Sequence, residues 1–131
     1  MTERDRPPRR SWPRKFRDAF RGLWIGVRGQ NSFAVHLPMA ALVIVAGIVL
    51  RVSLVEWCLL VLAIAVVLAA ELFNSALESL AKAIDVKHNL HLADGLDIGS
   101  AAVLASAIGA TAVGAIVFLY RLGVLLAWWS T

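Results

Sequence analysis

The stretch CLLVLAIAVVLAAELFNSALES, residues 58–79, joins an apolar run typical of a membrane span to two carboxylates and an amide. Neither Gly nor Pro occurs between residues 71 and 84, so nothing in the sequence ends the helix before Glu71, Asn74 and Glu78. An ionised carboxylate costs roughly 2.5 to 3.5 kcal/mol near the middle of a bilayer. The stretch therefore predicts a membrane helix that carries a polar, functional site.

Composition places the whole chain in the same class. Of its 131 residues, 60% are hydrophobic and 17% are charged, whereas soluble domains are about half apolar and a quarter charged. The length allows one domain. The single cysteine, Cys58, cannot form an intrachain disulfide, so the redox compartment stays open.

The N-terminal segment carries most of the positive charge. Residues 1–28 hold nine basic and three acidic side chains, a net +6, which leaves −2 over the rest. A basic cluster can indicate nucleic acid, but beside a hydrophobic span it indicates a cytoplasmic anchor, and we expect no nucleic-acid partner. A cleaved signal peptide is not expected, because the apolar run begins only near Phe33 and two more runs follow.

Residues 1–13, with three prolines and many charges, are predicted to form a disordered basic tail. Residues 14–28 show apolar side chains at three- and four-residue spacing, with arginines on the remaining arc. This pattern predicts a basic amphipathic helix on an anionic membrane surface. A calmodulin-type target would share the pattern, but the adjoining spans favour the membrane.

Three apolar runs follow, and they predict spans at about 33–50, 55–84 and 97–119, separated by a polar loop at 85–96. Residues 14–131 then form a single membrane domain. Because basic segments stay on the cytoplasmic side, the N-terminus is predicted to be cytoplasmic. Three spans then put the 85–96 loop in the cytoplasm and the C-terminus outside. The predicted fold is all-α and integral to the membrane: an N-terminal amphipathic surface helix plus three transmembrane helices.

The polar residues of the second span share one face. At 100° per residue they fall within an arc of roughly 100°. The members are Glu71, Asn74, Ser75, Glu78, Lys82 and Asp85. For Lys82 and Asp85 we expect no chemical role: they belong either to hydrogen-bonded polar packing between helices or to a part of the helix that extends into the cytosol. Glu71 and Glu78, two turns or about 10 Å apart, suit separate tasks, one taking a proton and one holding a cation.

The third span offers a matching surface. Asp97 and Ser100 lie on one face at its cytoplasmic end, and the segment at 99–114 is rich in small residues. Small residues four apart allow helices to approach closely. Three thin helices enclose little volume, so we expect oligomerisation, with an active site that can lie between subunits.

The motif ELFNSALE at 71–78, followed nineteen residues after Glu78 by DIGSAAV at 97–103, resembles the signature of the prokaryotic diacylglycerol kinases. The resemblance covers roughly residues 16–120. It implies a homotrimer in the bacterial inner membrane that uses MgATP to phosphorylate a lipid hydroxyl, with diacylglycerol converted to phosphatidic acid.

The resemblance also implies roles for individual residues. Glu71 matches the general base and Asn74 its neighbour in the site, while Glu78 and the position of Gln30 match the metal ligands. The nucleotide-contacting positions are Lys87, His88, Asn89 and Asp97. The lipid substrate is expected to contact Glu71, Ser100 and Phe33.

Two positions depart from the family pattern. Gln30 stands where a glutamate usually supplies a second metal ligand, so it offers Mg²⁺ one neutral oxygen and no charge. Leu96 stands where a lysine usually precedes Asp97, and leucine cannot neutralise a transferring phosphate. Lys82, Lys87 or an N-terminal arginine could substitute.

Three readings stay open at this point. An undecaprenol kinase shares the architecture and differs only in the lipid. A lipid-binding protein of the same fold with weakened or lost phosphoryl transfer is compatible with Gln30 and Leu96. A transporter subunit is disfavoured, because the carboxylates lie toward one end of the span and not at its midplane.

Overall fold

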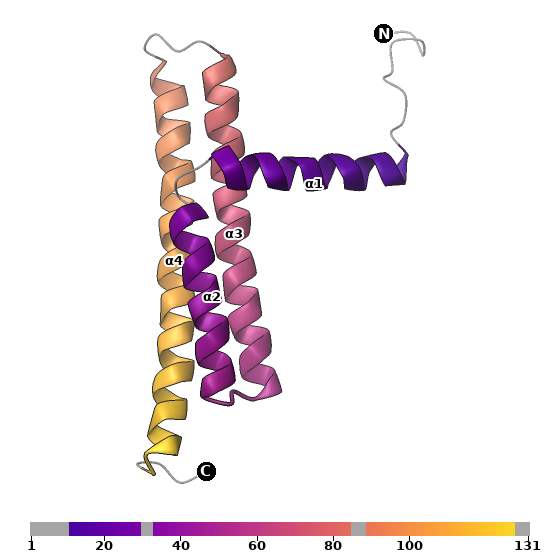
Figure 1. Cartoon of the computed structure of the whole chain (residues 1–131). Coiled ribbons are helices and arrows are strands. Elements are labelled where there is room, and N and C mark those ends of the chain that lie inside the picture. The colour runs from indigo at the N-terminus through magenta and orange to yellow at the C-terminus, as the bar shows by residue number, and fades with distance from the viewer. Residues whose placement is uncertain (1–10, 30–32, 85–88, 128–131) are drawn as a thin grey trace.

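The computed structural model describes residues 11–29, 33–84 and 89–127. These residues form four helices: α1 (Trp12–Gly29), α2 (Phe33–Val49), α3 (Leu54–Ala83) and α4 (Leu90–Leu125). No strand occurs in these three segments, which confirms the all-α prediction. Figure 1 shows α2, α3 and α4 side by side as a bundle, with α1 crossing it and projecting away.

Two helices are long and apolar enough to cross a membrane, namely α3 with 30 residues and α4 with 36. At 1.5 Å per residue, the 17 residues of α2 span about 25 Å, the short end of what a bilayer requires. The axes of α1 and α2 differ by 102°. Two of the three predicted spans therefore coincide with helices that are long and apolar enough to cross a membrane, and α2 as a third span remains a prediction.

The surface helix is amphipathic, as the spacing predicts, and its large apolar side chains are exposed, among them Phe16, Phe20 and Trp24. It begins two residues before the predicted start at 14, because Pro13 fits the first turn of a helix and Lys15 N–H donates to the Ser11 carbonyl at 3.1 Å. Such a helix can lay its apolar face on a membrane surface.

The contact of α1 with α3 lies near the end of α1. A Cβ added at Gly26 would lie 2.7 Å from Cδ2 of Leu72, so the absence of a side chain there permits a close approach. Leu72 follows Glu71 in the chain. The last turns of α1 therefore lie at the level of the polar motif, and α3 continues beyond them (Figure 1).

A capping box fixes the start of α3. The Ser53 hydroxyl accepts from Glu56 N–H at 3.4 Å, and the Glu56 carboxylate accepts from Ser53 N–H at 2.6 Å. The same carboxylate accepts from Nε of Arg121 at 2.7 Å. One glutamate thus starts α3 and ties it to the C-terminal part of α4.

We expect Arg121→Leu to lower the melting temperature of the detergent-solubilised protein by a few degrees, because the Glu56 carboxylate loses its cationic partner. The ion pair lies at the end of the bundle opposite the polar motif, so turnover per folded molecule should not change. Circular dichroism during heating and an activity assay would check both results. A loss of turnover without a loss of stability would contradict the prediction.

The start of α4 corrects the sequence prediction. The sequence pattern predicts a loop at 85–96 and a span from 97, but residues 90–96 are helical. Asn89 caps the helix, since its side-chain oxygen accepts from His91 N–H at 3.1 Å. Polar residues in the first turns suggest a loop, yet they are compatible with a helix that extends into water. The helix also ends later than 119, at Leu125.

The apolar core is small and lies toward the end of the bundle away from the polar motif. Val52, Leu60 and Val117 are its buried members. Gly47 lies against the Trp57 ring, which a Cβ there would approach to 2.7 Å. Most large apolar side chains of α2, α3 and α4 are exposed on the single chain. Lipid or further subunits must cover this surface in a membrane, and the trimer remains a prediction.

Candidate functional site

Glu71 lies inside the bundle, with 3% of its surface exposed. It comes from α3, where the helical period places it on the inward face. Its Oε1 lies 2.8 Å from Nε2 of His36, a residue of the first turns of α2. The sequence motifs did not single out His36; the available signal was that it is an ionisable side chain within an apolar run.

The distance between the two side chains is that of a hydrogen bond. Because a carboxylate oxygen only accepts, Nε2–H of His36 is the donor and Oε1 of Glu71 the acceptor. This contact offsets part of the free-energy cost of burying the Glu71 carboxylate. For an unpaired ion in a protein, that cost is several kcal/mol. Glu71 is therefore a paired buried acid.

Asn74 and Glu78 form the second part of the site. Nδ2 of Asn74 donates to Oε1 of Glu78 at 3.1 Å, one turn further along α3. Asn74 is buried, whereas Glu78 is partly exposed. The Asn74 side chain therefore holds a carboxylate that a ligand can still reach.

Gly99 of α4 closes the site from the other side. A Cβ at this position would lie 2.6 Å from Oδ1 of Asn74 and 3.0 Å from Cδ1 of Leu77. The Asn74 oxygen is buried there and has no hydrogen-bond partner among the described residues. The glycine thus lets α4 pack directly on the amide that holds Glu78.

We expect Gly99→Ala to cost about 1 to 3 kcal/mol of stability, the usual range for overpacking, and to lower activity by displacing Asn74. Gly109→Ala is the matched control on α4, since a Cβ there meets nothing within 4 Å. Thermal unfolding and turnover of both variants check this. Equal behaviour of the two alanine variants would show that α4 does not press on Asn74.

The predicted polar face of α3 is confirmed as far as the structure describes it. Glu71, Asn74 and Ser75 are buried, whereas Phe73 on the opposite arc is 74% exposed. The Ser75 hydroxyl donates to the Glu71 carbonyl at 2.8 Å, a local hydrogen bond within the helix. Lys82 is exposed, and Asp85 lies outside the described residues.

The α4 residues of the predicted site lie near Gly99 without joining the α3 cluster. Asp97 is exposed, and the exposed Ser100 donates to the Leu96 carbonyl at 3.1 Å. Asn89 is exposed as the cap of α4. Gln30, Lys87 and His88 lie outside the described residues, so their assigned roles stay predictions.

The lipid substrate is expected to contact Phe33, and the structure gives the position of this residue. It is the first residue of α2 and is 2% exposed. Its side chain is covered by the chain itself, so a lipid reaches it only if neighbouring helices move. Its contact with substrate stays a prediction.

The ligand atoms that the site offers suit a Mg²⁺ ion that binds together with a nucleotide. Within residues 11–29, 33–84 and 89–127, no three His, Cys, Asp or Glu side chains are grouped to hold a metal. Mg²⁺ in phosphoryl-transfer enzymes is usually held by one or two carboxylates together with substrate phosphates and water. Glu78 supplies one reachable carboxylate, which suits a metal shared with ATP.

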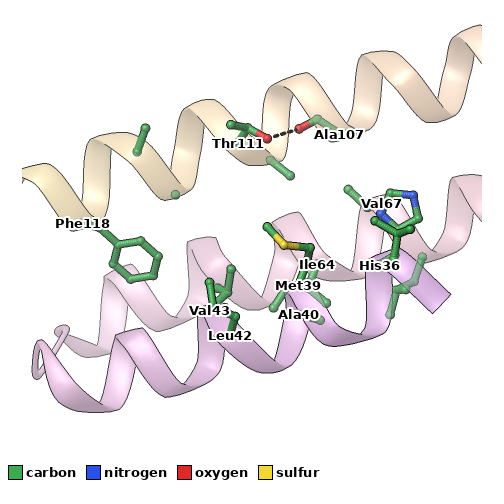
Figure 2. Close-up of a pocket in the computed structure, with 15 residues that line it drawn as sticks. His36, Met39, Ala40, Leu42, Val43, Ile64, Val67, Ala107, Thr111 and Phe118 are labelled. Atoms are coloured by element: carbon green, nitrogen blue, oxygen red, sulfur yellow. Dashed lines mark hydrogen bonds between the residues drawn. The ribbon is translucent and has the colours of Figure 1, made fainter. Parts of the chain in front are cut away.

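A cavity of about 500 Å³ lies between α2, α3 and α4. Its lining is apolar apart from His36 and Thr111, and the Thr111 hydroxyl donates to the Ala107 carbonyl at 2.8 Å. Figure 2 shows His36 at one end of this cavity and Phe118 at the other. His36, which contacts Glu71, thus forms one end of this apolar cavity.

This arrangement has relatives among known proteins. The profile of the family described as prokaryotic diacylglycerol kinase matches residues 17–118. The chain belongs to this family. It is also 29% identical over 109 residues to an undecaprenol kinase of Bacillus subtilis (strain 168), an alignment that covers 83% of this chain and 89% of the relative. No solved structure matches this chain.

The family membership confirms the resemblance drawn from ELFNSALE and DIGSAAV. Members of the family are lipid kinases, which are transferases that use ATP. Together with the apolar helices, the family makes the protein an integral membrane kinase. The lipid, the metal, the orientation and the assembly belong to the proposal below.

Proposed function

We propose that this protein transfers the γ-phosphate of MgATP to the hydroxyl of a membrane lipid, with Glu71 as the proton acceptor. The observation that carries the proposal is the buried Glu71 carboxylate, 2.8 Å from a histidine that lines an apolar cavity. A buried acid beside an apolar space suits a substrate whose hydroxyl arrives on a lipid tail.

The reaction is a single displacement at phosphorus. The lipid oxygen forms a bond to the γ-phosphorus, and the bond from that phosphorus to the β–γ bridging oxygen breaks, so ADP leaves with that oxygen. The hydroxyl proton passes to Glu71. Phosphoryl transfer depends mainly on positioning and charge stabilisation, so one base and an ordered nucleotide suffice.

Glu78 would hold Mg²⁺ with the phosphates, and Asn74 fixes Glu78 through the hydrogen bond of 3.1 Å. Bound Mg²⁺ would neutralise charge on the phosphate oxygens. Leu96 supplies no cation, and exposed Lys82, one turn beyond Glu78 on α3, is our candidate for that charge. Gln30 remains our candidate for a second, neutral ligand.

The geometry of the helices supports a site at the membrane surface. If α1 lies on the membrane, the parts of α3 and α4 beyond it project into the cytoplasm, where ATP is found (Figure 1). Glu71 then lies at lipid depth and Glu78 nearer to water. We propose a cytoplasmic N-terminus and α3–α4 connection in the bacterial inner membrane, and a homotrimer whose subunits cover the exposed apolar faces.

The orientation has a direct test. In a Cys58→Ser background, Leu90→Cys places a thiol on a side chain that is 80% exposed at the start of α4. We expect a membrane-impermeant maleimide to label it in inside-out vesicles and not in intact cells. Labelling from outside intact cells would reverse the topology and remove ATP from this end of the bundle.

Two lipids are candidates for the substrate. The family description names diacylglycerol, and the Bacillus subtilis relative is named for undecaprenol. Both present a hydroxyl on a long apolar molecule, and the cavity lining does not distinguish them. We infer that the protein phosphorylates one of these two lipids. Undecaprenol is as strong a candidate as diacylglycerol, because the alignment with the undecaprenol kinase covers 83% of this chain.

The deciding experiment uses purified protein, labelled ATP, Mg²⁺ and a panel of diacylglycerol, undecaprenol and ceramide. Transfer of label to one of the first two, absent in Glu71→Gln, is the expected result. No transfer to any lipid, with lipid binding retained, would favour the catalytically weakened lipid-binding protein that Gln30 and Leu96 leave open.

A further inference from the structure

We propose that His36 is a positioning residue for Glu71, holding the carboxylate through Oε1 so that Oε2 accepts the proton of the lipid hydroxyl. The inference rests on the proposed function and adds to it a residue from a different helix. The observation behind it is the separation of 2.8 Å between Nε2 of His36 and Oε1 of Glu71.

The neighbouring polar groups are engaged elsewhere. The Ser75 hydroxyl donates to the Glu71 backbone carbonyl and not to its carboxylate. The Asn74 amide donates to Glu78. Among the described residues, His36 is therefore the side chain that the structure places against the Glu71 carboxylate.

The environment of His36 makes it suited to this task. Phe33, on the same face of α2 one turn earlier, is buried and anchors the start of the helix. His36 also lines the cavity between α2, α3 and α4 (Figure 2), whereas Glu71 does not. A lipid hydroxyl that arrives through the cavity thus meets His36, and His36 orients Glu71, the proposed proton acceptor.

A positioning role predicts a specific pattern of kinetics. Removing the imidazole in His36→Leu leaves the carboxylate unheld, and a misplaced catalytic group typically costs about 10- to 100-fold in rate. The loss should be in kcat, with KM for MgATP unchanged, because the nucleotide is held by other residues. His36→Gln, which keeps an N–H donor of similar reach, should regain most of the loss.

The decisive measurement is a double-mutant cycle. If His36 acts through Glu71, then His36→Leu lowers kcat in the wild-type background but has no further effect in Glu71→Gln. Arg121→Leu is the matched control, since it removes the cationic partner of another α3 glutamate about 22 Å away, fifteen residues along the helix. It should leave kcat unchanged in both backgrounds.

The outcomes separate this proposal from the proposed function. Equal fold-losses from His36→Leu in both backgrounds, or full activity of His36→Leu, would overturn the positioning role while Glu71 keeps its own. Full activity of Glu71→Gln would overturn both. If His36→Leu does not fold, His36→Asn replaces it in the cycle, because its amide is polar but too short to reach Glu71.

Discussion

Glu71→Gln is expected to lower turnover by about 10²- to 10⁴-fold, the usual value of a general base, while MgATP affinity stays unchanged. The amide keeps the shape of the buried side chain and can still accept a hydrogen bond from His36, but it cannot take a proton. Glu71 lies about 10 Å along α3 from Glu78, so the nucleotide should not sense the change. Turnover and nucleotide binding, measured on the same preparation, check both parts.

Glu56→Gln is the matched control for this prediction. It is the same substitution on the same helix, at a carboxylate that pairs with Arg121 and starts α3. It should destabilise the protein and leave turnover per folded molecule unchanged. If Glu71→Gln retained full activity, proton removal would have to occur elsewhere, and Glu71 would have no part in the mechanism.

The polar face of α3 could be predicted because it depends on one helix alone. The period of 3.6 residues fixes the relative directions of Glu71, Asn74 and Glu78 before any packing is known. The apolar length of the preceding residues then indicates which environment surrounds them. Both arguments use only neighbours in the sequence, and the structure confirms the first, since Glu71 and Asn74 are buried on one face of α3.

Contacts between helices could not be predicted in this way. His36 meets Glu71 and Gly99 meets Asn74 because of the relative registers of α2, α3 and α4, and the sequence pattern contains no information on register. A stripe of small residues on α4 indicated close packing, but not which glycine contacts which amide. The start of α4 was placed too late for a different reason: helix turns in water need no apolar periodicity.

The exposed apolar faces show what a single chain leaves open. Most large apolar side chains of the bundle have no partner surface within the described segments, and Asp97 and Ser100 face outward. Residues that are apart in one chain can meet across a subunit boundary. We therefore expect the nucleotide half of the site to be completed by assembly, and the acid half to exist within each chain.

Glu78→Gln should affect both turnover and MgATP affinity, each by more than about 10-fold, the lower end of the losses seen when a metal site is weakened. The carboxylate supplies the charge that a hard cation requires, and an amide supplies one neutral oxygen. The hydrogen bond from Asn74 can still be accepted, so the side chain keeps its place. Excess Mg²⁺ should therefore restore part of the loss by mass action.

The same Mg²⁺ series on Glu71→Gln separates the two carboxylates. Because that variant lacks a proton acceptor and keeps its metal ligand, extra Mg²⁺ should restore nothing. Two variants with the same Mg²⁺ response and equal losses of turnover and affinity would mean that the polar face acts as one structural unit. A response confined to Glu78→Gln would place the metal near the C-terminal end of α3 and the proton transfer two turns earlier, where His36 meets Glu71.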